Sequence, residues 1–215
     1  MNLVEWLQRL MTNFGAEWVM WLLLGLSVIS VAIMLERAWF YHQLRDDTEK
    51  LASELRERLR KSDIAGARKL LGDSPSAEAA VVMSGLDEAD RGAKSASEAM
   101  VGARALQRVK LERRLAYLGT LGNNAPFVGL FGTVYGILHA FQSMKNAESA
   151  GISAVAGGIS EALITTALGL IVAVPAVWLF NYFTGKVDSF VVEMDNSASE
   201  LIDYFLKNRT RRLNS

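Results

Sequence analysis

One acidic residue, Glu161, lies in a stretch that is otherwise uncharged. Residues 159–183 read ISEALITTALGLIVAVPAVWLFNYF, and Glu161 is the single charged residue among them. A carboxylate in a bilayer core costs about 3 kcal/mol or more, so acids inside membranes commonly mark ion pathways or proton relays. Because Glu161 is only the third residue of the stretch, a solvated position at headgroup depth is the alternative interpretation.

Small and hydroxyl residues accompany this acid at helical spacing. Glu161 and three further residues follow one another at four-residue intervals, which places them on one helix face. Thr166 stands beside this face. The three further residues are Thr165, Gly169 and Ala173. A narrow polar track on an apolar helix predicts that the helix faces a pore or a partner helix.

A second apolar stretch, residues 118–141, has a matching face. Small residues let helix backbones approach closely in membranes, and these two faces have no apparent partner inside one chain. They therefore predict helix packing between subunits and a ring oligomer. Thr133 belongs to the same face and is a second candidate for the ion pathway, although threonines in spanning helices often bond their own i−4 carbonyl. Pro126 and Pro175 predict kinks. The small residues of this face are Gly129, Gly132, Gly136 and Ala140.

Charged and apolar residues are segregated along the chain. Of 215 residues, 51% are hydrophobic, yet 23 acidic and 23 basic residues remain. This segregation predicts an all-α integral membrane protein in which roughly 20 apolar residues form each span. The expected segments are an interfacial amphipathic helix at 1–17, spans at 18–35, 118–141 and 159–183, a charged helical region at 36–117, a linker at 142–158 and an amphipathic tail at 184–215.

The N-terminal segment has an alternative interpretation as a cleaved signal peptide, but it lacks the basic start and the small-residue cleavage site of such peptides. Catalytic chemistry is not expected. The chain has no cysteine and only two histidines, which are far apart in sequence, and it contains no nucleophile–base pair, metal cluster or phosphate-binding loop. No cofactor or metal is therefore expected. The charges of 36–117 are expected to lie on solvated helix faces, except that basic residues near the second span are expected to contact the phosphates of membrane lipids.

The distribution of basic residues predicts the orientation in the membrane. Sixteen of the 23 lysines and arginines lie in 36–117 and five in 184–215, whereas 1–17 and 142–158 hold one each. Cytoplasmic loops carry an excess of these residues. The charged region and the tail are therefore expected in the cytoplasm and the N-terminus outside, in the periplasm.

Two long motifs resemble one known family. Residues 125–137, APFVGLFGTVYGI, are similar to the second-span signature of the ExbB/TolQ proteins, relatives of the MotA flagellar stators. Residues 158–170, GISEALITTALGL, followed by Val174-Pro175-Ala176 and Asn181, resemble the third-span signature. The chain departs from the family's usual pattern at Gly157, where proline is common, and at Thr165, where alanine is common.

The resemblance implies a motor subunit. Members of this family form a pentamer around the single helices of an ExbD-, TolR- or MotB-like partner, whose membrane aspartate carries the ion. The coupling ion that the resemblance implies is a proton. Carried over, Thr133 and Thr166 match the pore-lining threonines and Glu161 the third-span glutamate. The implied role is to couple ion flow across the bacterial inner membrane to outer-membrane transport, envelope integrity or surface motility. A structural scaffold without ion conduction is the alternative.

Overall fold

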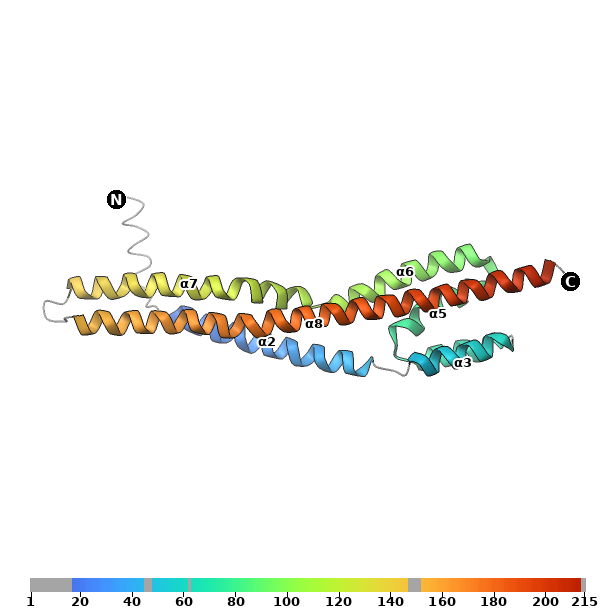
Figure 1. Ribbon diagram of the computed structural model, residues 1–215, viewed down its shortest axis with the longest axis horizontal. Coiled ribbons are helices and arrows are strands. Elements are labelled where there is room, and N and C mark those ends of the chain that lie inside the picture. The colour runs from blue at the N-terminus through green and yellow to red at the C-terminus, as the bar shows by residue number, and fades with distance from the viewer. Residues whose placement is uncertain (1–16, 45–47, 62, 147–151, 214–215) are drawn as a thin grey trace. The chain divides into compact units, whose positions relative to one another are not determined.

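The computed structural model describes residues 17–44, 48–61, 63–146 and 152–213 (Figure 1). The interfacial helix expected at 1–17 lies, except for its last residue, outside these described residues. Within them the chain is helical and contains no strand, which confirms the all-α class. The helices are α2 (Glu17–Gln43), α3 (Thr48–Arg60), α4 (Ile64–Asp73), α5 (Ala77–Asp87), the short 3-10 helix η1 (Ala89–Arg91), α6 (Ala93–Glu112), α7 (Leu115–Asn146) and α8 (Ile152–Leu213).

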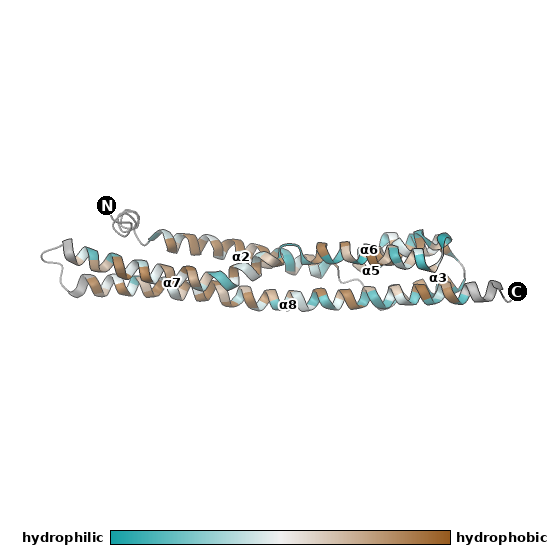
Figure 2. Ribbon diagram, turned by 90° about the horizontal axis from the view of Figure 1, so that it is seen from above, coloured by the Kyte–Doolittle hydropathy of each residue, from teal (hydrophilic) through white to brown (hydrophobic). Residues whose placement is uncertain are grey.

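Three of these helices, α2, α7 and α8, are long and apolar enough to cross a membrane. Large apolar side chains stay exposed along them, among them Trp21, Phe127 and Trp178. Exposed apolar surface on this scale fits contact with lipid or with another protein. Figure 2 shows the same contrast, because apolar residues dominate α2 whereas hydrophilic residues recur along the C-terminal part of α8. The prediction of three spanning helices is confirmed.

The third predicted span and the tail form one continuous helix, α8. Pro175 lies inside α8 and Pro126 inside α7, and neither breaks its helix. In a spanning helix, neighbouring groups can compensate for the missing proline N–H. A bend at these prolines stays a prediction. Helix also covers residues 142–146 and 152–158 of the expected linker.

The chain divides into two compact units. We call the first the apolar unit: it comprises Met1–Leu35 and Arg114–Asn181. Its core is a small cluster in which α2, α7 and α8 meet. Val128 and Leu168 pack against this cluster from its edge. The buried residues of the cluster are Val19, Leu23, Ala125, Val172 and Ala173.

The second unit, which we call the charged unit, comprises Glu36–Arg113 and Tyr182–Ser215. Side-chain caps define its short helices: the Asp63 carboxylate accepts from the Gly66 N–H at 2.9 Å, and the Ser76 hydroxyl from the Ala79 N–H at 3.1 Å. Such caps satisfy N–H groups that have no partner within the helix. Large apolar side chains form the core, including Leu55, Leu59, Leu71, Val82, Leu86, Met100, Met194 and Leu201.

Candidate functional site

The glycine faces of α7 and α8 pack against each other within one chain. A Cβ atom added at Gly129 would lie 3.1 Å from the Thr165 carbonyl oxygen, and one at Gly169 would lie 2.8 Å from that of Ala125. At Gly136 the added atom would lie 2.8 Å from the Ala162 Cβ. In this region α7 and α8 run side by side in both views of the chain (Figures 1 and 2).

This packing corrects one step of the sequence interpretation. The small-residue faces were expected to lack a partner inside the chain, and on that ground to predict an oligomer. They have such a partner: Gly129 and Gly136 of α7 contact α8, and Ala173 of α8 is buried in the cluster with α2. The faces therefore explain close helix contact within one subunit, and a ring needs separate support.

Two hydroxyl groups meet at this close contact. Thr133 of α7 and Thr166 of α8 share a hydrogen bond between their Oγ1 atoms. Thr166 Oγ1 also donates to the Gly129 carbonyl at 3.0 Å, across the helix pair. Thr133 Oγ1 lies 3.3 Å from the carbonyl oxygens of both Gly129 and Ala162. The absence of a side chain at Gly129 is what lets α8 come close enough for this network.

The network can be arranged in two ways. A threonine hydroxyl has one proton to donate and two lone pairs to accept with. When Thr133 donates to Thr166, Thr166 donates to the Gly129 carbonyl. When Thr166 donates to Thr133, Thr133 donates to the carbonyl of Gly129 or Ala162. Both hydroxyl protons are bonded in either case, so the chain of hydrogen bonds can reverse its direction without leaving a donor unpaired.

Thr165 has a different environment from Thr166. Its side chain is only 4% exposed and it donates to its own i−4 carbonyl, that of Glu161, at 3.2 Å. Its Cβ lies 3.2 Å from where a Cβ on Gly132 would stand, so it fills the space that this glycine leaves. This is the arrangement of a threonine that packs and satisfies its hydroxyl locally. The position of Thr165 therefore fits helix packing better than a route for ions.

The Glu161 side chain is exposed in the single chain. No ion pair or side-chain hydrogen bond involves its carboxylate among the described residues. It precedes Ala162, whose carbonyl belongs to the threonine network. The structure thus places Glu161 one residue from the network, on the surface of the apolar unit, where a partner or water can reach it.

Two buried hydroxyl groups in the apolar unit were not singled out from the sequence. Ser30 of α2 and Tyr135 of α7 are buried, and their oxygens have no hydrogen-bond partner among the described residues. The Tyr135 ring stacks on that of Phe131, with centroids 6.3 Å apart. The burial of Ser30 could have been predicted, because Ser30 lies seven residues after Leu23 and hence on the same buried helix face.

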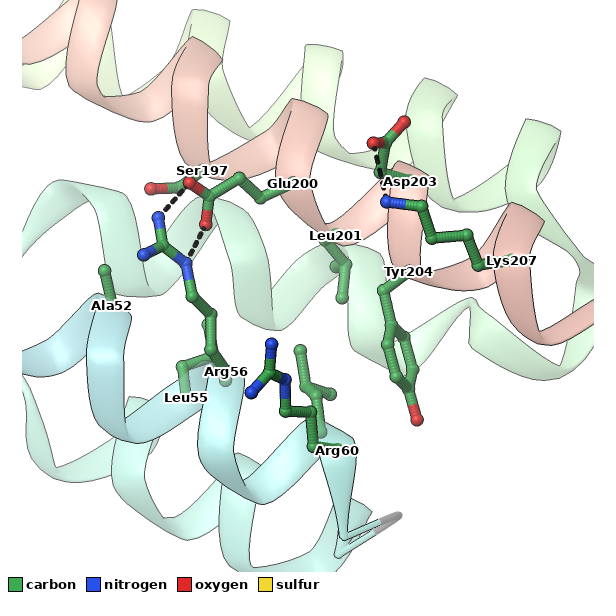
Figure 3. A pocket seen from close by; sticks show the side chains of 11 residues that line it. Ala52, Leu55, Arg56, Arg60, Ser197, Glu200, Leu201, Asp203, Tyr204 and Lys207 are labelled. Carbon is green, nitrogen blue, oxygen red and sulfur yellow. Dashed lines mark hydrogen bonds and ion pairs between the residues drawn. The ribbon is translucent and has the colours of Figure 1, made fainter.

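A cavity of about 440 Å³ lies between α3 and α8 of the charged unit (Figure 3). Its charged side chains are largely paired with one another. Arg56 of α3 pairs with Glu200 of α8, and Lys207 lies 3.5 Å from Asp203. Leu55 and other leucines form its apolar part. Arg60 also lines the cavity and has no ion pair among the described residues, so three basic side chains stand there against two acids.

Comparison with known proteins identifies the family. Residues 73–196, more than half of the chain, match the MotA/TolQ/ExbB proton channel family. The chain belongs to this family. The matched residues include the complete glycine and threonine network of α7 and α8. The resemblance inferred from the two motifs is thus confirmed, and the family is one of membrane channels.

Over the aligned residues, curated relatives are 38–46% identical to the chain. A Biopolymer transport protein ExbB of Xanthomonas campestris is 46% identical over 99 residues, covering 46% of this chain and 39% of that protein. The ExbB of Salmonella typhimurium is 38% identical over 117 residues, with 49% and 47% covered. The Tol-Pal system protein TolQ of Pseudomonas aeruginosa is 39% identical over 130 residues, with 60% and 52% covered. The chain thus spans about half the length of the curated relatives it matches.

Proposed function

We propose that the chain is a ring subunit of a proton-driven motor in the bacterial inner membrane. In this proposal several copies, five by analogy with the family, surround the helices of an ExbD/TolR-like single-span partner. Proton flow through the ring drives relative rotation of the partner. That movement energises a process of the kind the relatives' names indicate, biopolymer transport or the Tol-Pal system.

The hydroxyl pair of Thr133 and Thr166 is the observation that carries this proposal. It joins the two helices that hold both family motifs, and its hydrogen bonds can reverse direction as a proton relay requires. Since hydroxyls do not hold a proton long at neutral pH, a carboxylate must bind the ion between steps. None of the predicted spans contains an aspartate, which supports a partner that supplies one.

Glu161 acts in this proposal as a fixed acid beside the relay. In a ring of subunits, each copy contributes one Glu161 carboxylate. Protonation of the partner's aspartate removes a negative charge, so the repulsion between this aspartate and the Glu161 carboxylates falls. The partner helix then prefers a different subunit. Moving one charge through the membrane supplies about 2.3 kcal/mol per 100 mV, which is enough to bias such a step. Thr165 has no part in the route, because its hydroxyl is bonded within its own helix.

Valine substitutions test the relay. Thr133→Val and Thr166→Val keep the side-chain shape and remove the hydroxyl. If the lost hydrogen bond of about 1–3 kcal/mol contributes to the barrier for proton transfer, flux should fall about 5- to 160-fold. We would measure flux with a pH-sensitive dye in proteoliposomes that hold the chain and its co-purified partner. Thr120→Val is the matched control, because the Thr120 hydroxyl donates to the Ala116 carbonyl of its own helix and does not bridge to another described helix.

Glu161→Gln tests the fixed acid separately. The change keeps most of the side-chain volume and removes the titratable charge, so motor activity should be lost at every pH while partner binding survives. Normal activity of Glu161→Gln would identify the residue as a solvated boundary acid and would leave the relay to the threonines. If both valine variants conduct normally, the hydroxyl pair is not part of the proton route. If the unmodified chain with its partner shows no proton flux, the chain is a structural scaffold, which is the alternative function.

Cysteine labelling tests the proposed orientation. The chain has no native cysteine, so Ser62→Cys and Ser149→Cys introduce single thiols in the charged region and in the linker. With the N-terminus in the periplasm and the C-terminus in the cytoplasm, an impermeant thiol reagent applied to intact spheroplasts should label position 149 only. The opposite labelling pattern would refute this orientation.

A further inference from the structure

A second cavity of the charged unit, about 380 Å³ in volume, lies between the C-terminal end of α2 and the beginning of the unit's part of α8. Aromatic rings form one wall. Tyr41 of α2 lies against Phe183 and Phe190 of α8, with ring centroids 5.3 and 6.3 Å apart. The Tyr41 hydroxyl donates to the Leu111 carbonyl at 2.8 Å, which fixes the ring in place. The wall is therefore rigid and mainly apolar.

The other lining residues give this cavity a basic side. Lys186 is half-buried beside it, with its amine 5.9 Å from the Tyr182 ring centre. No salt bridge involves Lys186 among the described residues, in contrast to Lys207 of the α3–α8 cavity, which faces Asp203. His42 adds an imidazole donor. Glu193, two helical turns beyond Lys186, is the single acid in the lining.

The cavity lies where two apolar helix segments end. On α2, the uncharged run 18–35 closes with Glu36-Arg37, directly before the cavity residues 38–44. On α8, residues 162–185 are uncharged and Lys186 is the next residue. Trp39 is 68% exposed and Tyr182 53% exposed at these ends. Aromatic residues concentrate at the level of lipid headgroups, so both helices place the cavity at that depth.

We propose that this cavity binds the phosphate headgroup of an anionic phospholipid. Lys186 pairs with the phosphate, and His42 donates a hydrogen bond at the rim. The wall of Tyr41, Phe183 and Phe190 contacts the glycerol and the first methylenes of the acyl chains. Free phosphate offers the same charge, but it leaves an aromatic wall without a partner, which favours the lipid. The site is separate from the threonine network and does not depend on the proposed proton route.

Lipid-dependent unfolding of the purified full chain in detergent tests this site. Phosphatidylglycerol should raise the unfolding midpoint, and zwitterionic phosphatidylcholine should raise it less. Lysines near an anionic membrane surface contribute about 1 kcal/mol each, so Lys186→Gln should raise the half-saturating phosphatidylglycerol concentration about fivefold. Glu193→Gln removes the opposing charge and should lower that concentration. Lys69→Gln makes the same charge change at an exposed residue of α4. It is the matched control and should leave that concentration unchanged.

Three results would overturn the proposal. The first is an equal response to phosphatidylglycerol and phosphatidylcholine. The second is an equal response to inorganic phosphate, which would identify the ligand as a free anion. The third is the same affinity in Lys186→Gln as in Lys69→Gln, which would mean general surface attraction. Should Lys186→Gln fail to fold, Lys186→Arg keeps the charge and should bind normally, and unchanged binding in Glu193→Gln would then refute the site.

Discussion

The two units hold their helices together with opposite kinds of side chain. In the apolar unit, glycine and alanine bring α7 and α8 together, and uncharged hydroxyls bridge them. In the charged unit, large leucines and methionines fill the core, and ion pairs join one helix to another. Those pairs are Arg56–Glu200, Arg68–Asp87, Arg104–Asp195 and Arg108–Asp188.

The difference follows from the surroundings that each unit is built for. In lipid there is no hydrophobic gain when apolar side chains leave the solvent, so helices associate through close packing and hydrogen bonds between them. In water the burial of large apolar side chains is the main stabilising contribution, and surface charges keep the unit soluble. The contrast predicts that the apolar unit is sensitive to added volume and the charged unit to changes in its buried polar groups.

The largest effect is expected from Gly169→Ala in the apolar unit. The new Cβ would stand 2.8 Å from the Ala125 carbonyl oxygen and 3.1 Å from the Gly129 Cα, and both are backbone atoms that cannot turn away. Overpacking of this kind costs about 1–3 kcal/mol. We expect a lower unfolding midpoint in detergent and weaker coupling between Thr133 and Thr166, which sit at the same contact.

Gly25→Ala is the control for this substitution. Apart from the backbone of its own helix turn, Gly25 of α2 has no atom within 4 Å of an added Cβ, so this change adds the same methyl group without a clash. Alanine also has the higher helix propensity, by about 1 kcal/mol. Equal destabilisation of the two variants would show that the α7–α8 contact is looser than its geometry indicates, and the comparison between the units would lose its basis.

Local patterns in the sequence predicted much of the apolar unit but not the direction in which each side chain faces. Span positions and small-residue faces repeat every three or four residues, so one segment suffices to find them. Thr165 and Thr166 are neighbours with the same chemistry, and about 100° of helix rotation separates them. Only the packing of α7 and α2 shows that Thr165 is buried and that Thr166 bonds across to α7.

In the charged unit the sequence predicted helices and solvated charges, and two charges are exceptions. Arg37 is 3% exposed, donates to the Leu111 carbonyl at 3.4 Å and lies over the Phe40 ring. Glu78 is also buried. Arg37 also pairs with the adjacent Glu36 at 2.9 Å, whereas the Leu111 carbonyl and the Ser197 partner of Glu78 lie more than 70 positions away. No local pattern contains these distant contacts. Long-range contacts decide which charge of a helical region is buried.

A smaller effect is expected from Glu78→Gln in the charged unit. The Glu78 carboxylate accepts from the Ser197 hydroxyl, and its Oε2 has no partner among the described residues. Burial raises the pKa of Glu78, and the negative charges of Glu193 and Glu200 raise it further. A folded-state pKa above the unfolded one means that the folded form binds the proton more tightly. Proton binding to Glu78 therefore stabilises the folded state at low pH, and this stabilisation is lost as the pH rises through the folded-state pKa.

Replacement by glutamine should mimic the protonated acid. Above the raised pKa, Glu78→Gln should stabilise the charged unit by on the order of 1 kcal/mol, the scale of one unsatisfied buried polar atom. The gain should shrink as the pH falls. Hydrogen exchange of the α5 amides, measured between about pH 5 and 8, reports local unfolding of the helix that carries Glu78. Exchange should be slower in the variant at neutral pH.

Glu57→Gln provides a control of opposite sign. A hydrogen bond from Lys61 lowers the pKa of the exposed Glu57, so its charged form contributes stability at neutral pH that is lost on acidification. Glutamine there should not stabilise at any pH. If Glu78→Gln also fails to slow exchange at neutral pH, water reaches the carboxylate and the group is not buried in solution.

The smallest effect is expected from the ion pair between α3 and α8. Arg56 and Glu200 form a two-point contact in which Arg56 Nε donates to Glu200 Oε2 at 2.8 Å, yet their side chains are 60% and 46% exposed. Water screens exposed pairs, so a double-mutant cycle with Arg56→Ala and Glu200→Ala should give a coupling of only about 0.2–1 kcal/mol. That coupling should fall further as salt is raised towards 1 M.

A coupling of several kcal/mol that persists in high salt would contradict the comparison, because ion pairs would then be the main stabilising contribution to the charged unit. A weak coupling would mean that the leucines beneath the pair hold α3 on α8, and that the pair mainly selects which face of α3 turns towards α8.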